Sequence, residues 1–146
     1  MAAMPRKASI DWIDFALEAL ARDGPGALVP ESLAARAGLS RGAFYHRFAS
    51  VEAFQAELLE AWRQRCTEAV IEASRASPPG PERQALLSRA ASAINHNLDR
   101  AVRAWALSDP RARAAVSAVD QTRIAWIREA LAPEQAHRDR LAEAGV

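Results

Sequence analysis

The sequence holds a single cysteine, no long apolar run and almost no excess of charge. Cys66 cannot form a disulfide within the chain, which is compatible with a reducing compartment such as the cytoplasm. No apolar stretch approaches the ~20 residues of a membrane span, and no signal-peptide core follows the N-terminus. We therefore expect a cytoplasmic protein with no membrane partner. The net charge of +1 gives no support for nucleic-acid binding by charge alone.

Motifs for catalysis and for metal binding are also missing from the sequence. It contains no glycine-rich phosphate loop, no Cys-x-x-Cys and no His-Glu-x-x-His. The three histidines lie too far apart in sequence to suggest a metal site, at His46, His96 and His137. The sequence therefore gives no positive sign of an enzyme, and we expect no metal and no cofactor.

Alanine is abundant, residues that favour strands are sparse, and the 146 residues include only 6 glycines. Hydrophobic residues make up 50% of the chain and charged residues 25%, as in a compact globular unit. We therefore predict an all-α fold. Its first part is a three-helix module at 1–50, and its second part is a helical regulatory region at 51–146.

The most informative stretch is 33–48, which reads LAARAGLSRGAFYHRF. Gly38 lies where one helix ends and the backbone needs a positive φ, and Ser40 is a good N-cap for the next helix. Phe44 and Phe48 are four residues apart and form the buried stripe of that helix. The pattern predicts a helix-turn-helix, whose second helix has the size of a major-groove recognition helix.

The other face of the helix predicted at 40–48 carries side chains that suit DNA. Arg41 can donate a fork of hydrogen bonds to guanine or to phosphate, and Ala43 can touch a thymine methyl group. Gly42 costs a helix about 1 kcal/mol, and close approach of the backbone to DNA is a reason to keep it. Tyr45 and His46 can donate to phosphate oxygens. The predicted DNA-binding residues are Lys7, Arg36, Ser40, Arg41, Gly42, Ala43, Tyr45 and His46.

A glycine and an apolar turn residue alone also fit a plain helical hairpin in another all-α domain. The ordered set from Ala34 to Phe48 is more specific, and it resembles the signature of the TetR family of bacterial regulators. The close resemblance covers residues 10 to about 62. It implies a ligand-responsive repressor, acting as a homodimer, that reads a palindromic DNA operator. The alternative is a degenerate helical interaction protein that pairs with a full-length regulator and does not bind DNA.

The sequence departs from the family at three places. Many members carry lysine near the start of the helix after the recognition helix, whereas this chain has Ala49 and Val51 and no lysine beyond Lys7. Leu28 and Val29 stand where threonines are frequent, so one phosphate-binding N-cap is lost. These changes predict that the protein binds DNA with modest affinity, or that its binding relies on a few basic residues. These residues are Arg6, Lys7, Arg36 and Arg41. The third departure is that the family's two long dimer-forming helices are not recognisable, so we expect an incomplete C-terminal region.

Apolar stripes and Pro/Gly breaks place the remaining helices. Beyond the recognition helix, the predicted ranges are helices at 9–22, 30–37, 50–76, 82–107 and 110–132, and an irregular tail at 133–146. The core stripe predicted for the first helix is Ile10, Ile13, Leu17 and Leu20, with Ser9 as N-cap and Trp12 outside the stripe. Uncovered apolar residues on the helices at 82–107 and 110–132 are predicted to form a weak dimer contact; the candidates are Leu87, Ile94, Val119 and Ile127.

A small-molecule effector needs a mostly apolar cavity with a few polar groups. The polar run Asn95-His96-Asn97 lies within an apolar pattern and is either a solvated face or part of such a lining. The large tryptophans are either core residues or walls of the cavity. The candidate ligand-binding set is Trp62, Asn95, His96, Trp105 and Trp126. Cys66 is interpreted as a small buried hydrophobic residue rather than a redox sensor.

Overall fold

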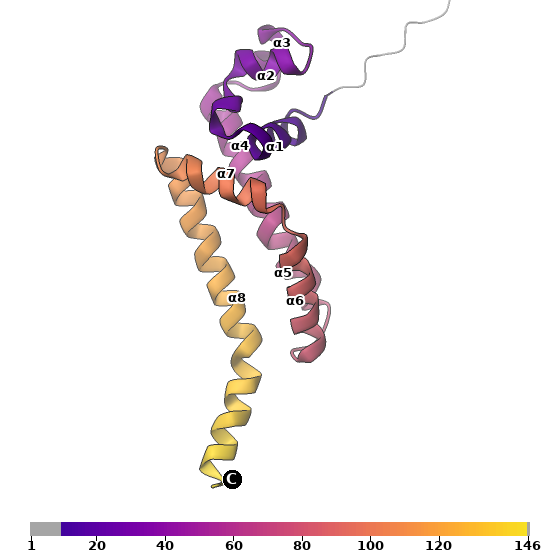
Figure 1. The fold of residues 1–146 in the computed structure, drawn as a ribbon, viewed down its shortest axis with the longest axis vertical. Helices are drawn as coiled ribbons and strands as arrows, with labels where there is room; N and C mark the ends of the chain where they lie inside the picture. The colour runs from indigo at the N-terminus through magenta and orange to yellow at the C-terminus, as the bar shows by residue number, and fades with distance from the viewer. Residues whose placement is uncertain (1–9, 146) are drawn as a thin grey trace, which may run out of the picture.

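The structure, a computed structural model, describes residues 10–145. Within these residues every regular element is a helix, which confirms the all-α prediction (Figure 1). The elements are α1 (Trp12–Asp23), η1 (Pro25–Leu28), α2 (Pro30–Arg36), α3 (Arg41–Arg47), α4 (Val51–Arg63), η2 (Gln64–Glu68), α5 (Ala69–Arg75), α6 (Pro81–Ala93), α7 (His96–Ala106) and α8 (Pro110–Glu143). Of these, η1 is a 3₁₀ helix and η2 is a π-helical turn.

Side-chain caps set where the N-terminal helices begin. The carboxylate of Asp11 accepts from the backbone N–H groups of Ile13 and Asp14, each at 3.0 Å, so α1 starts at Trp12. This start is later than the predicted one, and the predicted cap Ser9 lies outside the described residues. At α3 the prediction is confirmed, because Ser40 Oγ accepts from the N–H of Ala43 at 3.3 Å.

The core of the N-terminal module is built around Phe44 of α3, which is fully buried. Its ring packs edge-on against Trp12, with centroids 5.6 Å apart, and against Phe54 of α4, with centroids 5.0 Å apart. Trp12 is buried, so the prediction that it lies outside the core stripe is wrong. Because α1 places residues i, i+4 and i+8 on one face, Trp12 lies in line with the buried Ala16 and Leu20.

The predicted linker helix at 50–76 is present as α4, η2 and α5, which follow one another without a break. Ser50 caps its start by accepting from the N–H of Ala53 at 3.0 Å. The π-helical turn in the middle was not predicted from the sequence. Such turns insert one extra residue into a helix and are often found at functional sites. The linker therefore changes its helical register halfway between the module and its own C-terminal end.

The predicted single helix at 82–107 is wrong, because the chain divides it into α6 and α7. Ile94 is extended, with φ −61° and ψ 137°, and Asn95 Oδ1 accepts from the N–H of Leu98 at 3.1 Å. The predicted irregular tail at 133–146 is also wrong over most of its length, because α8 continues to Glu143. A proline costs a helix one hydrogen bond and does not have to end it.

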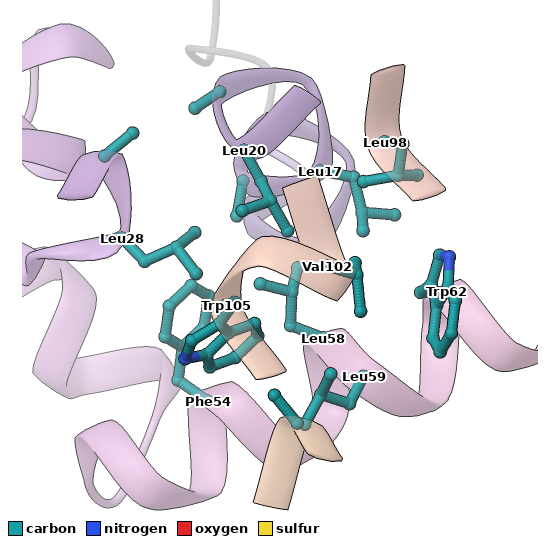
Figure 2. Packing of buried hydrophobic residues seen from close by; sticks show 14 of the residues in the cluster. Leu17, Leu20, Leu28, Phe54, Leu58, Leu59, Trp62, Leu98, Val102 and Trp105 are labelled. Carbon is teal, nitrogen blue, oxygen red and sulfur yellow. The ribbon is translucent and has the colours of Figure 1, made fainter. Parts of the chain in front are cut away.

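One continuous hydrophobic core joins the module to the C-terminal helices. Helix α7 packs against both α1 and α8, as Figure 1 shows, and it brings Leu98, Val102 and Trp105 onto the apolar faces of α1 and α4 (Figure 2). Val119 of α8 is fully buried in the same core. It was predicted to be uncovered, and that prediction is wrong because α7 and α4 cover this part of α8.

Candidate nucleic-acid interface and ligand pockets

The turn between α2 and α3 fixes the direction in which α3 leaves the module. Gly38 has φ +68°, a conformation that other residues rarely adopt. Leu39 packs against the hydrophobic core and closes the angle between the two helices. With Ser40 capping α3 and Phe44 locked in the core, the orientation of α3 about its own axis is determined.

The outward face of α3 carries the predicted recognition residues. Arg41, Gly42, Tyr45 and His46 are exposed and occupy positions i, i+1, i+4 and i+5 of the helix, which lie on one face. The guanidinium of Arg41 lies 5.3 Å from the centre of the Tyr45 ring. Ala43 is half-buried against the core, so it lies at the edge of this face.

The remaining predicted contacts lie around this face. Ser40, the cap of α3, is exposed at its N-terminal end, and Arg36 lies at the end of α2. Lys7 lies outside the described residues. The structure thus brings six predicted DNA-binding residues together along α3 and its cap.

Acidic side chains neutralise the arginines of the module. Arg41 Nε lies 3.0 Å from Glu31, and Arg47 donates two hydrogen bonds to Glu57, the shorter at 2.9 Å. Arg36 pairs with Asp23, and this contact, followed by that with Arg22, holds the pKa of the Asp23 carboxyl below its usual range. The sequence reasoning missed these partners, because Asp23, Glu31 and Glu57 come from α1, α2 and α4, and each lies ten or more residues from the arginine it pairs with.

Gly42 has no packing reason to be glycine among the described residues. A Cβ added there would meet Ser40 Oγ at 3.7 Å, an ordinary contact, and its φ is not positive. The glycine therefore destabilises the helix, and no contact within the fold compensates for this loss. A requirement from outside the chain, such as close approach of a partner to the backbone, remains a consistent reason for it.

The five predicted ligand-binding residues do not form one site. Trp62 and Trp105 are buried in the core between α1, α4 and α7 (Figure 2), and His96 is exposed. Asn95 caps α7 and also lines a groove of about 570 Å³ between α1, the linker helix and α6. Trp126 of α8 lines a different pocket.

That second pocket has a volume of about 310 Å³ and lies between η2, α5, α6 and α8. We call it the Arg123 pocket. Its lining residues are Cys66, Thr67, Val70, Ile71, Leu87, Ser88, Ala91, Ile94, Arg123, Trp126 and Ile127. Most of them are apolar, and among them only Arg123 carries a charge.

Arg123 ties α8 to the π-helical turn of the linker. Its Nε donates to Thr67 Oγ1 at 3.0 Å and its Nη2 to the carbonyl of Cys66 at 3.3 Å. The same Nη2 lies 3.2 Å from Asp99 of α7, which also accepts from Arg103 at 2.9 Å. Sequence analysis missed Arg123, because one arginine on a long polar helix gives no signal of its own.

Cys66 is buried beside this network, as the sequence predicted. Burial raises the pKa of its thiol, and the carboxylate of Asp99 raises it further. The protonated thiol is therefore the stable form, and such a thiol is a poor nucleophile. This agrees with the interpretation of Cys66 as a packing residue.

Comparison with known proteins locates the family within the N-terminal part. Residues 13–58 match the family model described as bacterial regulatory proteins, tetR family. This part of the chain, less than half of its length, is therefore similar to the N-terminal module of TetR-family regulators. The match covers α1 to α3 and the first half of α4, so it includes the whole exposed face of α3. No curated protein and no solved structure matches the chain.

A TetR-family module is the DNA-binding part of a transcriptional regulator, and regulators of this family are not in general enzymes. Among the described residues, no group of His, Cys, Asp or Glu side chains is arranged to hold a metal ion. None of the helices between residues 10 and 145 is both long and apolar enough to cross a membrane.

Proposed function

We propose that this protein is a ligand-responsive transcriptional repressor that binds a palindromic operator through α3. The observation that carries the proposal is the exposed face of α3 within a TetR-family module. Phe44 anchors the opposite face in the core, so Arg41, Gly42, Tyr45 and His46 keep a fixed outward direction. A recognition helix needs this combination of a rigid support and a free polar face.

Each residue of this face has a proposed role. Arg41 binds guanine or phosphate with its Nη groups, while Glu31 and the ring of Tyr45 hold its guanidinium. Tyr45 and His46 donate to phosphate oxygens, and Gly42 lets the backbone come close to the DNA. Arg36 is a further phosphate contact once it leaves Asp23.

The response to a ligand is proposed from the position of the two cavities. Both are lined partly by the linker helix, which begins directly after the recognition helix and its turn. A ligand that favours one arrangement of η2 would therefore shift the orientation of the module relative to α8. Regulation requires such a difference in ligand affinity between two states of the protein.

A palindromic operator calls for two modules, so we propose that the repressor works as a homodimer. The half-sites of such an operator are about 34–36 Å apart, one turn of DNA. A single α3 offers few base contacts, too few for tight and specific binding at cellular salt concentrations. The exposed apolar residues of α8 are the proposed contact and include Ile124, Ile127 and Leu131.

A second candidate function is a helical interaction protein that pairs with a full-length regulator and does not bind DNA. The observation in its favour is that acidic residues pair with the arginines around α3, namely Arg36, Arg41 and Arg47. Any phosphate contact by these arginines must compete with the acidic partners. The electrostatic attraction to DNA is weaker for the same reason.

Titration of labelled DNA that flanks the gene with the full chain, at several salt concentrations, separates the two candidates. The proposed repressor binds the DNA, and its affinity falls as the salt concentration rises, because bound cations are released from phosphates. Unrelated DNA of the same length is the control. Absence of binding even at low salt would support the interaction protein and contradict the repressor.

A further inference from the structure

We propose that the Arg123 pocket binds a small apolar carboxylate, with Arg123 as the group that pairs with the ligand's negative charge. This inference rests on the proposed ligand-responsive function and names the chemical class of the effector. Four observations support it: the lining of the pocket, the fixed position of Arg123, the buried Arg83 behind Trp126 and the volume.

The lining offers an apolar surface and no negative charge. The walls include Val70 and Ile71 of α5, Leu87 of α6 and Ile127 of α8. The polar groups apart from Arg123 are two hydroxyls, the thiol of Cys66 and the Trp126 indole. Among the described residues of the lining there is no carboxylate. A ligand with a cationic group would meet no counterion here, whereas a ligand with an anionic group meets Arg123.

Arg123 is held in place at the pocket and stays partly exposed. Hydrogen bonds to Thr67 and to the Cys66 carbonyl fix its guanidinium at the pocket. The Arg123 side chain is 25% exposed. Its paired carboxylate, Asp99, also pairs with Arg103, which in turn pairs with Asp120. A planar guanidinium that is already oriented suits a carboxylate, because the two groups can form parallel hydrogen bonds.

A buried arginine lies behind Trp126, although the neighbouring groove that Trp126 also lines holds Glu68, Glu72 and Glu129. The guanidinium of Arg83 lies 5.4 Å from the centre of the Trp126 ring, and Arg83 is 8% exposed. It donates to the backbone carbonyl of Ser77, and none of the carboxylates whose side chains the structure describes, a set that leaves out residues 133–135, forms an ion pair with it. A buried charge without a counterion is costly, and a nearby anion would reduce that cost.

The volume limits the size of the ligand. A pocket of about 310 Å³ stands at the lower end of the range usual for small-molecule sites, which is roughly 300–1,000 Å³. The ligand is therefore a small molecule with one short apolar body and one carboxylate, rather than a long lipid or a polyanion.

The test is calorimetric titration of the full chain, without DNA, with three ligands of equal length. These probes are octanoate, octanamide and octylammonium. We expect octanoate to bind about tenfold more tightly than octanamide, because it gains a charge-assisted pair with Arg123. We expect octylammonium to bind no better than octanamide. Equal affinity for all three, or no binding of octanoate at millimolar concentration, would overturn the proposal.

Two substitutions on α8 locate the site. Arg123→Gln should weaken octanoate binding about tenfold and leave octanamide unchanged, and Arg123→Lys should restore part of the affinity. Arg113→Gln is the matched control, because Arg113 also lies on α8 and bonds a backbone carbonyl, that of Ala106, away from the pocket. The same octanoate affinity in Arg123→Gln and Arg113→Gln would overturn the assignment of Arg123.

A third substitution keeps the test decisive if Arg123→Gln does not fold. Ala91→Phe adds a ring at the α6 wall without removing any bond of Arg123, and it should weaken all three ligands. Unchanged octanoate affinity in this variant would place the ligand elsewhere. DNA binding is measured separately: DNA binding without octanoate binding rejects only this inference, and octanoate binding without DNA binding rejects only the repressor.

Discussion

Phe44 and Tyr45 are neighbours in sequence with opposite surroundings, since Phe44 is fully buried and Tyr45 is 38% exposed. The difference follows from the helix, which turns successive side chains by about 100°. Because of this rotation, Phe44 packs in the core of the module, while Tyr45 faces outward and is available for the proposed DNA contact. Substitutions at these two positions therefore separate stability from binding.

We predict that Phe44→Ala lowers the free energy of unfolding by about 3–5 kcal/mol, the usual cost of removing a buried aromatic ring. The total stability of a small domain is about 5–15 kcal/mol, so the melting temperature should fall steeply. Thermal unfolding followed by circular dichroism measures the change, and Tyr45→Ala is the matched control. A melting temperature for Phe44→Ala within a degree or two of the wild type would show that the packing of α3 is different.

Gly42 gives a prediction in which stability and binding move in opposite directions. Gly42→Ala should stabilise the fold by up to about 1 kcal/mol, since alanine favours helices and the added Cβ meets no close neighbour. The same substitution should weaken DNA binding if the backbone approaches the DNA at this position. Chemical unfolding and a DNA titration are measured on the same variant. Unchanged DNA affinity would remove Gly42 from the interface.

At the scale of the elements, caps and turns account for most of what the sequence predicted. The turn at Gly38, the caps Ser40 and Ser50 and the end of α5 before residues 77–80 were predictable, because each depends on one residue with a strong local preference. The exposed face of α3 was predictable for the same reason: it follows from the cap and from the buried Phe44.

The elements that were not predictable depend on tertiary packing. The π-helical turn η2 has no strong local signal, and Arg123 of α8 bonds its Cys66 carbonyl from far away in the sequence. The break before α7 was missed because Ile94 continues the apolar pattern of α6, although Asn95 is a good N-cap. The Arg123 pocket joins elements distant in the chain, so sequence reasoning found Trp126 and not Arg123.

The break between α6 and α7 can be tested with two asparagines. Asn95→Ala should lower the free energy of unfolding by about 1 kcal/mol, because it removes the cap of α7. Asn97→Ala, two residues further and exposed, should change it by less than about 0.5 kcal/mol. Urea unfolding of both variants measures the difference. Equal effects would mean that Asn95 does not act as a cap.

At the scale of the whole molecule, the shared core makes the module and the C-terminal helices one packed unit. Helix α7 contacts both α1 and α8, so buried side chains connect α8 to the module. The C-terminal half of α8 extends beyond α5 and α6 in Figure 1 and carries exposed apolar residues. Such residues mark an interface when they form a continuous patch.

We predict that the chain forms a weak dimer through α8. Sedimentation at several protein concentrations should show a monomer–dimer equilibrium, and Ile124→Glu should shift it toward the monomer. Leu107→Glu is the control, because Leu107 is an exposed apolar residue at the end of α7 and outside α8. A monomer at all concentrations up to high micromolar would contradict the α8 dimer, and an equal shift by Leu107→Glu would place the contact elsewhere.

The central claim, that the exposed face of α3 binds DNA, is tested most directly by titrating one DNA fragment with the wild type, Arg41→Ala and Tyr45→Ala at several salt concentrations. Arg89→Ala, an exposed arginine on α6, is the control. We predict that the α3 variants keep the wild-type helicity and lose affinity, and that Arg41→Ala reduces the salt slope by about 0.9 if Arg41 contacts a phosphate. The same affinity in Arg41→Ala, Tyr45→Ala and the wild type would contradict the assignment of α3 as the recognition helix.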